Sequence, residues 1–284
     1  MGTKFTKKIF AILIVIALVI QILPNIVTAA LNHDTGTPAN FGISILGPTG
    51  RGYRIGGGST PETIIFRIGV KTSNNSSNLD YSNSVYCLAK TKKFPTDDDN
   101  NTGNYKSVGT ASSSNITEYD SIKKIIDAMY IPGTTNREQW IKKYVVPLLK
   151  AQLYDDDDTV EQIYNDINDP NSERYYLSDD DIFVTQQLAI WHFTETNFDW
   201  PGASLVMTKT DSRNFPTNGI AHDYSGKYEA MRLLYNYLTN NPVADSSYIT
   251  QSSVWKVDPD NNEMQPLLYV SKTPIKYDAA LQKQ

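Results

Sequence analysis

Residues 178–195 read SDDDIFVTQQLAIWHFTE, and this stretch predicts a helix. Ser178 is a good N-cap, because its hydroxyl can accept a hydrogen bond from a free backbone N–H at the helix start. The three aspartates at 179–181 follow at the end of the helix where the dipole favours negative charge. The apolar run behind them contains two adjacent glutamines, Gln186 and Gln187. The sequence therefore places two side-chain amides on a largely apolar helix.

Further helices are expected on both sides of this stretch. Apolar residues recur at helical spacing over 119–129 and 140–149, and YEAMRLLYNYL over 228–238 predicts another helix. Pro147 should kink or delay the second of these helices, because proline lacks the backbone N–H that a helix needs. Residues from about 118 to 240 are therefore expected to be mainly helical.

The flanking parts of the chain are typical of β structure. Strand-like runs occupy 40–46, 63–71 and 84–90, separated by stretches rich in Gly, Ser, Thr and Asn. After residue 248, SSVWKV and QPLLYV are separated by the turn-like DPDNNEM. Because strands and helices are segregated along the chain, the sequence predicts an α+β fold. We expect a β-sandwich or barrel-like subdomain with a large helical insertion at about 118–240, within a domain of 31–271.

Residues 1–30 have the features of a signal peptide. Three lysines precede the apolar run 9–23, and small residues at 27–29 suit cleavage by signal peptidase. The apolar run is shorter than the ~20 residues of a membrane span, although an uncleaved N-terminal anchor is the alternative. We therefore expect an exported protein, either at the cell surface or secreted.

Composition and charge exclude several classes of function. The formal net charge is -5, and removal of the leader's lysines makes the remainder more acidic, so nucleic-acid binding is not expected. A hydrophobic fraction of 40% is enough for a folded core. One cysteine can form neither a disulfide framework nor a Cys-based zinc site, and we expect no metal and no cofactor.

Two acidic runs, 97–99 and 155–181, are expected to be solvated surface. Asp98 and Asn100 fit the first half of a calcium-binding EF-hand loop, but Gly109 stands where that loop requires glutamate. Incidental calcium binding is the alternative.

The single cysteine, Cys87, has three interpretations. It is a buried small hydrophobe, or a nucleophile with His192 or His222 as partner, or one half of a cross-link to glutamine. His33 lies just past the leader and is a poorer partner. Nucleophilic cysteines usually lie at helix starts, where the thiol pKa is lowered, whereas Cys87 is expected in the middle of a strand.

The cross-link interpretation rests on the chemistry of a thiol beside an amide. A thiolate held against a glutamine side chain can displace ammonia and leave an internal thioester, provided that apolar groups exclude water. Gln186 and Gln187 lie beside Ala189, Ile190 and Trp191, which supply such groups.

Two short motifs extend this interpretation to a family. Residues 86–88, Tyr-Cys-Leu, resemble the aromatic–Cys–apolar motif of the thioester domains at the tips of Gram-positive surface proteins. Residues 187–191, Gln-Leu-Ala-Ile-Trp, are similar to that family's second motif, Thr-Gln-x-Ala-Ile/Val-Trp, which supplies the glutamine. The resemblance covers about residues 40–270, with cysteine in an early β region, glutamine in a helical segment and β structure afterwards.

The resemblance also sets the register of the glutamine. Alignment of Trp191 with the tryptophan of the motif places the reactive glutamine at Gln187. The threonine of the motif then falls on Gln186, and the nearest threonine is Thr185. Gln186 is therefore the alternative glutamine.

The resemblance implies a covalent adhesin used in host attachment rather than an enzyme. A lysine amine of a host surface or matrix protein attacks the thioester once, releases the thiol and leaves an isopeptide-type amide. No residue then has a catalytic role; Tyr86, Ala189, Trp191 and His192 are supporting or shielding residues. His192 directly follows the motif and is either a proton shuttle or an ordinary helix residue. The second alternative is favoured, because the spacing of His192 from Gln187 turns its side chain away from the face of the helix that carries Gln187.

The tail and the competing functions complete the expectations. Residues 272–284 are expected to be a linker or the start of a following stalk module, in a monomeric domain of a longer surface protein. The chain has no Leu-Pro-x-Thr-Gly sorting motif, so we expect a fragment, or alternatively a secreted protein. The competing functions are a non-covalent binding module that uses its 18 tyrosines, and a Cys–His transferase or peptidase.

Overall fold

The computed structural model describes residues 38–39, 41–44, 51–55, 63–65, 67–71, 79–92, 105–169, 172, 175–202, 205–209, 225–257 and 263–275. All of these lie within one structural unit, residues 34–284. The expected leader, His33, His222 and the acidic run 97–99 lie outside the described residues. Within the described part of the chain, no helix has the length and apolar character needed to cross a bilayer.

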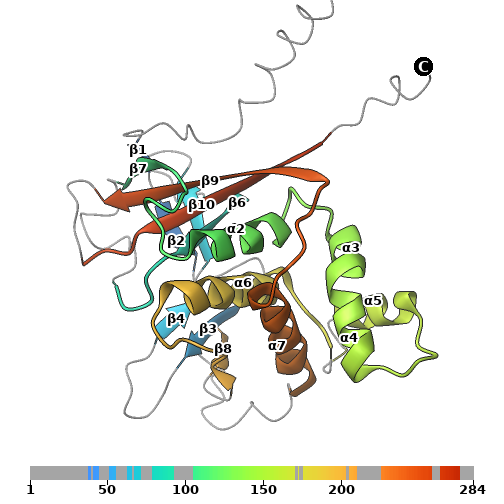
Figure 1. The fold of residues 1–284 in the computed structure, drawn as a ribbon. Coiled ribbons are helices and arrows are strands. Elements are labelled where there is room, and N and C mark those ends of the chain that lie inside the picture. The colour runs from blue at the N-terminus through green and yellow to red at the C-terminus, as the bar shows by residue number, and fades with distance from the viewer. Residues whose placement is uncertain are drawn as a thin grey trace, which may run out of the picture. The chain divides into compact units, whose positions relative to one another are not determined.

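Two antiparallel sheets carry the strands (Figure 1). The larger sheet has the order β1-β7-β9-β10-β6-β5-β2, and the smaller has the order β4-β3-β8. The strands of the larger sheet are β1 (Pro38–Ala39), β2 (Phe41–Ser44), β5 (Arg67–Lys71), β6 (Leu79–Cys87), β7 (Tyr105–Thr110), β9 (Tyr248–Val257) and β10 (Leu267–Pro274). The strands of the smaller sheet are β3 (Arg51–Ile55), β4 (Thr63–Ile65) and β8 (Leu205–Lys209).

The helices follow β7 in the chain and precede β9, with β8 among them. They are α2 (Tyr119–Ala128), α3 (Arg137–Trp140), the π-helix η2 (Ile141–Val145), α4 (Val146–Leu153), α5 (Val160–Asn168), α6 (Asp179–Thr194) and α7 (Ser225–Thr239). The expected α+β class is therefore confirmed. The finer expectation, a sandwich or barrel-like subdomain with a large helical insertion, stays a prediction.

Helix α6 is the expected helix of residues 178–195, and it is buried on nearly every side. Ser178 and Asp181 form a capping box, in which each side chain accepts a hydrogen bond from the other residue's backbone N–H. The helix packs against α2 and α7 and also contacts β6 and β3 (Figure 1). A helix buried all round has no polar face, which is why α6 lacks a one-sided apolar pattern.

The prediction that Pro147 disturbs its helix is confirmed. Helices α3 and α4 are joined by η2, which ends directly before the Val146–Pro147 step. A proline ring collides with the carbonyl one turn earlier, and a π-helical turn is a known way of accommodating such a break. Trp140 at the end of α3 is buried, and its Nε1 donates to the Ala128 carbonyl at 2.8 Å, which attaches this helix to α2.

Several elements differ from the sequence-based expectations, and β7 is a strand where none was expected. Helix α5 lies inside the supposed acidic surface, begins with a Thr159–Gln162 capping box and buries Ile163 and Ile167. The run 63–71 is not one strand, because β4 and β5 belong to different sheets. Strands β3 and β8 pair with each other although they are far apart in the sequence, and such pairing has no local signal.

The expectation of a solvated acidic run at 155–181 is wrong for its last residues. Asp180 and Asp181 are 5% and 0% exposed. Asp181 caps α6, and Asp180 lies 3.8 Å from the guanidinium of the buried Arg67. These carboxylates are buried because each has a specific polar partner, as buried charges require.

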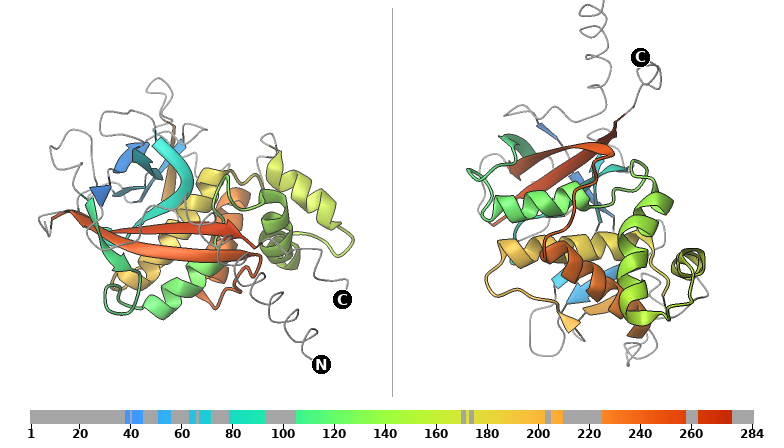
Figure 2. Two further views of the ribbon diagram at one scale, coloured as in Figure 1. Left: turned by 90° about the horizontal axis from the view of Figure 1, so that it is seen from above. Right: turned by 45° about the vertical axis from the view of Figure 1, so that its right-hand side comes forward.

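Strands β9 and β10 form the expected hairpin and also hold the end of α2. Their pairing runs from Leu267 opposite Trp255 to Pro274 opposite Tyr248, so β10 continues past the expected boundary at 271. The views of Figure 2 show these two strands side by side. Lys272 of β10 is 4% exposed and donates to the carbonyl oxygens of Asp127 at 2.9 Å and Met129 at 2.7 Å. A cation there complements the negative end of the α2 dipole.

Lys272 should give the protein a distinctive pH dependence of stability. Burial lowers the pKa of Lys272 from 10.5 to about 8, although Asp245 and Asp127 oppose that effect. Between these pH values the unfolded chain binds more protons than the folded chain, so the free energy of unfolding rises with pH. The rise is limited to about 3 kcal/mol, because a tenfold difference in proton affinity between the two states corresponds to ~1.4 kcal/mol.

Denaturant unfolding from about pH 7 to about pH 9.5, for wild type and Lys272→Met, measures this effect. The difference between the two proteins is informative, because buried tyrosines such as Tyr86, whose pKa is raised by burial, titrate in both. We expect the wild-type stability to rise relative to the variant. A difference that stays constant across this range would contradict the expected depressed pKa.

Candidate functional site

Cys87 is the last residue of β6. At this position β6 pairs with β10 along one edge, whereas the described pairing along its other edge has already ended. The Leu88 N–H donates to the Pro266 carbonyl at 3.0 Å, at the end of the β6–β10 pairing. Backbone groups of successive residues in a strand point to opposite edges, so the N–H and C=O of Cys87 face away from β10. Strand β5 lies on that edge, but its pairing with β6 ends at Ile68 opposite Val85.

The side-chain amide of Gln187 takes the place of the missing strand at Cys87. The Cys87 N–H donates to Gln187 Oε1 at 2.8 Å, and Gln187 Nε2 donates to the Cys87 carbonyl at 2.9 Å. Cys87 is 1% exposed and Gln187 is 2% exposed. Two residues that lie one hundred positions apart in the chain are therefore held together in the interior by their polar groups.

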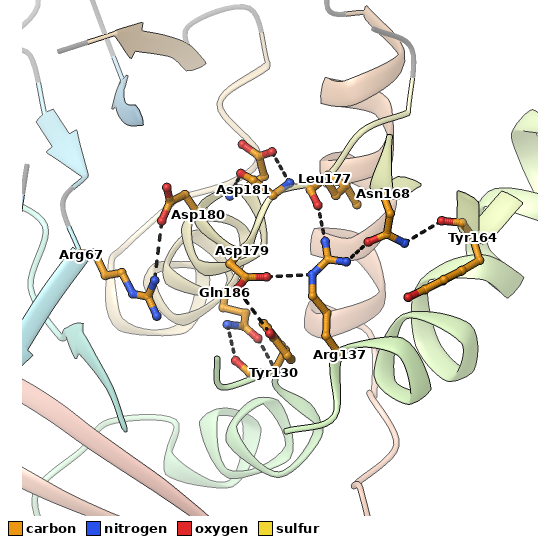
Figure 3. A network of polar contacts seen from close by, with 11 residues as sticks. Arg67, Tyr130, Arg137, Tyr164, Asn168, Leu177, Asp179, Asp180, Asp181 and Gln186 are labelled. Atoms are coloured by element: carbon orange, nitrogen blue, oxygen red, sulfur yellow. Dashed lines mark hydrogen bonds and ion pairs between the residues drawn. The ribbon is translucent and has the colours of Figure 1, made fainter. Parts of the chain in front are cut away.

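Gln186 makes an equivalent contact with a different segment. Its Oε1 accepts from the Tyr130 N–H at 2.7 Å, and its Nε2 donates to the Tyr130 carbonyl at 3.1 Å and to the Tyr86 hydroxyl at 2.9 Å. Figure 3 shows the paired contact with Tyr130. The two glutamines thus clamp two backbones, with Gln187 on β6 and Gln186 on the residues after α2.

Tyr86 belongs to the Gln186 side of this arrangement. Its ring stacks on Phe183 of α6 with centroids 4.9 Å apart, and its side chain is fully buried. Burial raises the pKa of the Tyr86 hydroxyl, with smaller opposing effects from its polar neighbours and Arg67. Tyr86 therefore supports the site by fixing α6 against β6.

Trp191 and Ala189 are both fully buried in α6. Trp191 follows Gln187 by one helical turn, so both side chains lie on one stripe of the helix. The indole meets Phe198 edge-on with centroids 6.0 Å apart. Among the described residues, the indole Nε1 has no hydrogen-bond partner. This stripe therefore presents an apolar surface next to the clamped amide.

His192 is engaged with α7 in the described contacts. Its Nδ1 lies 2.8 Å from the Tyr235 hydroxyl, and that hydroxyl donates to Asp199 at 3.3 Å. The ring also meets Phe193 and Tyr235 edge-on. These contacts fit the interpretation of His192 as an ordinary helix residue rather than a partner of Cys87.

The surroundings of Cys87 disfavour a charged sulfur. Burial raises the pKa of the Cys87 thiol well above its usual range, the opposite of what a nucleophilic cysteine needs. The pKa of the neighbouring Tyr105 hydroxyl is raised by burial and further by a charge on Cys87. The Tyr105 hydroxyl donates a hydrogen bond to the Gln265 carbonyl at 2.9 Å. A thioester carries no charge on sulfur, so this apolar site suits the bonded form better than a free thiolate.

Charged contacts at the start of α6 fix the position of both glutamines. Arg67 of β5 lies 3.8 Å from Asp180, and both side chains are almost fully buried. Arg137 bonds Asp179 at 2.8 Å and also contacts Asn168 and the Leu177 carbonyl (Figure 3). These ion pairs come from β5 and α3, so the sequence of α6 alone does not reveal them.

Two further contacts near the site were not expected, and one had a signal in the sequence. Glu195 directly follows α6 and accepts a hydrogen bond from the Lys90 N–H. Because Glu195 lies eight residues after Gln187, helical spacing could have placed it on the same stripe. The clamp on Tyr130 involves backbone atoms, for which no residue type is diagnostic.

The chemistry of the site is therefore that of a thiol and an amide in an apolar interior. Within the described residues, no group of three or more His, Cys, Asp or Glu side chains is placed to hold a metal ion. Comparison of the chain with protein-family models, curated proteins and solved structures finds no match.

Proposed function

We propose that residues 31–271 are a thioester domain of an exported adhesin. In this proposal the Cys87 sulfur attacks Cδ of Gln187, the carbon–nitrogen bond breaks, and the nitrogen leaves as ammonia with the thiol proton. The observation that carries the proposal is the two-sided clamp of the Gln187 amide on the Cys87 backbone, with both residues buried.

The clamp supports thioester formation through positioning. An amide fixed against the backbone of the cysteine reacts as part of the same molecule, which replaces an encounter in solution by a prearranged contact. The buried neighbours Tyr86, Ala189 and Trp191 also favour a long-lived bond, because excluded water cannot hydrolyse it.

The second step would attach the protein to its target. A lysine amine of a host surface or matrix protein attacks Cδ of Gln187, the carbon–sulfur bond breaks, and a proton from the amine ends on the sulfur. The product is an amide to the target and a free Cys87 thiol. Ammonia has already left, so the electrophile is not regenerated and the protein acts once rather than as an enzyme.

The wider context belongs to the same proposal. It includes export through the leader, a place at the cell surface of a Gram-positive bacterium or secretion, and a monomeric domain within a longer protein. It also includes the finer architecture, a β-sandwich or barrel-like subdomain with a helical insertion.

A non-covalent binding module with an unreactive cysteine is the second candidate function. The observation that favours it is the behaviour of Gln186, which makes the same two-sided backbone clamp where there is no cysteine. Gln187 would then be a structural residue that replaces a strand at the end of β6.

Intact-protein mass distinguishes these candidates. We expect the wild-type domain, with its leader removed, to be lighter than the calculated chain by the mass of one ammonia molecule. Cys87→Ala should have its full calculated mass, because the attacking sulfur is gone. A wild-type protein of full mass, whose thiol is titratable after unfolding, would support the non-covalent module instead.

A further inference from the structure

The segment that leaves Cys87, residues 88–92, is tied down on two sides; we call it the strap. On one side the Leu88 N–H donates to the Pro266 carbonyl at 3.0 Å, and Gln265 Nε2 donates to the Lys92 carbonyl at 2.7 Å. On the other side the Lys90 N–H donates to the Glu195 carboxylate. The strap therefore joins the start of β10 to the end of α6.

The strap follows the second half of α6. Gln187 holds Cys87 and Glu195 holds Lys90. Glu195 lies eight residues after Gln187, so the two contacts are about two helical turns apart on α6. Trp191 is one helical turn from each of these two helix residues, so it lies between them on the side that faces the strap.

The strap leads directly away from a closed site. Cys87 and Gln187 are 1% and 2% exposed, so no partner's amine can reach the bond between them in this conformation. In the strap itself, Thr91 is exposed and Ala89 and Lys90 are partly exposed. The Lys90 ammonium lies over the ring of Phe198, 5.5 Å from its centroid, which adds a second contact beside Glu195. Reaction with an amine therefore requires movement around these two residues, and the strap is the segment that continues directly from Cys87.

We propose that Glu195 is a positioning residue that holds the strap closed, so that opening of the strap decides which amines reach Gln187. This inference rests on the proposed function. A small amine needs only a narrow opening, whereas a lysine on a polypeptide needs displacement of the strap from Glu195. The closed strap thus protects the thioester from water and selects amines by size.

The test compares the coupling rates of methylamine and of a lysine-containing peptide. Glu195→Ala removes the acceptor for the Lys90 N–H and should raise the peptide rate relative to the methylamine rate by about tenfold or more, the effect of losing one charge-assisted hydrogen bond. Glu195→Gln keeps an acceptor oxygen without its charge, so its rate ratio should lie between those of wild type and Glu195→Ala. Glu138→Ala is the matched control, since that carboxylate on α3 is 57% exposed and pairs with Lys142 of η2.

Size selectivity separates this role from a merely structural one. If Glu195→Ala changes both rates equally, or only lowers the thermal unfolding midpoint, the proposed role of Glu195 is wrong. If the wild-type protein has its full mass, the thioester fails but the strap can still be tested on the free thiol. Iodoacetamide and a bulky maleimide then replace the amines, and an unchanged ratio of their rates in Glu195→Ala overturns the inference.

Discussion

Gln187→Ala is expected to abolish the ammonia loss and leave Cys87 as a free thiol, whereas Gln186→Ala is expected to keep the lighter mass. The physical reason is the partner of each amide. Gln187 is clamped on the backbone of Cys87, and Gln186 is clamped on the backbone of Tyr130. The measurement is the intact mass of each purified variant, together with titration of the thiol after unfolding.

The two variants control for each other unusually well. Both residues are glutamines on one helix, 1% and 2% exposed, and each satisfies one buried N–H and one buried C=O. Each loss should therefore destabilise the fold by about 1–3 kcal/mol for each backbone group left without a partner, and Gln186→Ala also removes the bond to the Tyr86 hydroxyl. A difference in mass between the variants would then reflect chemistry rather than folding.

The opposite result has a definite meaning. If Gln186→Ala loses the ammonia-depleted mass and Gln187→Ala keeps it, the register of the reactive glutamine is wrong by one residue. Where truncation to alanine prevents folding, Gln187→Met and Gln186→Met retain most of the side-chain volume and remove the amide, so the comparison can be repeated.

Helix α6 shows how far the sequence leads at this site. Its start could be predicted from Ser178 and the three aspartates behind it, because N-capping is a local interaction. The sequence also places the two adjacent glutamines on this helix. Their partners were not, since side chains on successive helix positions point about 100° apart and the sequence of a helix does not say what lies on either side.

The contacts that orient α6 come from distant parts of the chain. Arg67 pairs with Asp180 from β5, and Tyr130 meets Gln186 from the segment after α2. Cys87 lies beyond the end of the pairing between β6 and β5, and β4, which precedes β5 in the chain, belongs to the other sheet. Strand pairing between remote segments depends on the whole fold, so the strand run at 63–71 could be recognised but its division could not.

The acidic run shows the opposite failure, in which a reasonable local interpretation is overridden. A cluster of aspartates ordinarily faces water, because burial of an unpaired charge is costly. Asp180 and Asp181 are nevertheless inside, since Arg67 and the Ser178 N–H compensate for their loss of water. Composition could not distinguish these two residues from Asp155 and Asp156, which are exposed.

The native domain is expected to couple to a small primary amine once per chain, with the appearance of one thiol per coupled amine. A thioester is activated toward aminolysis, and the product amide between Gln187 and the amine has no comparable reactivity. Cys87→Ala and Gln187→Ala should both show no coupling at all, so the expected effect is complete loss. Mass spectrometry of the adduct and thiol titration measure the two products separately.

The pH dependence of this coupling gives the sharper test of mechanism. A free lysine amine has a pKa of ~10.4, so its reactive unprotonated fraction rises about tenfold for each pH unit above neutrality. We expect the coupling rate to follow that rise, because no described contact places the ring of His192 at Cys87 to take up the proton. A rate that is flat above neutrality would instead indicate a base in the site that deprotonates the amine. Continued consumption of amine, with more than one amine converted per chain and Cys87 still required, would contradict a single-use bond and favour the Cys–His enzyme.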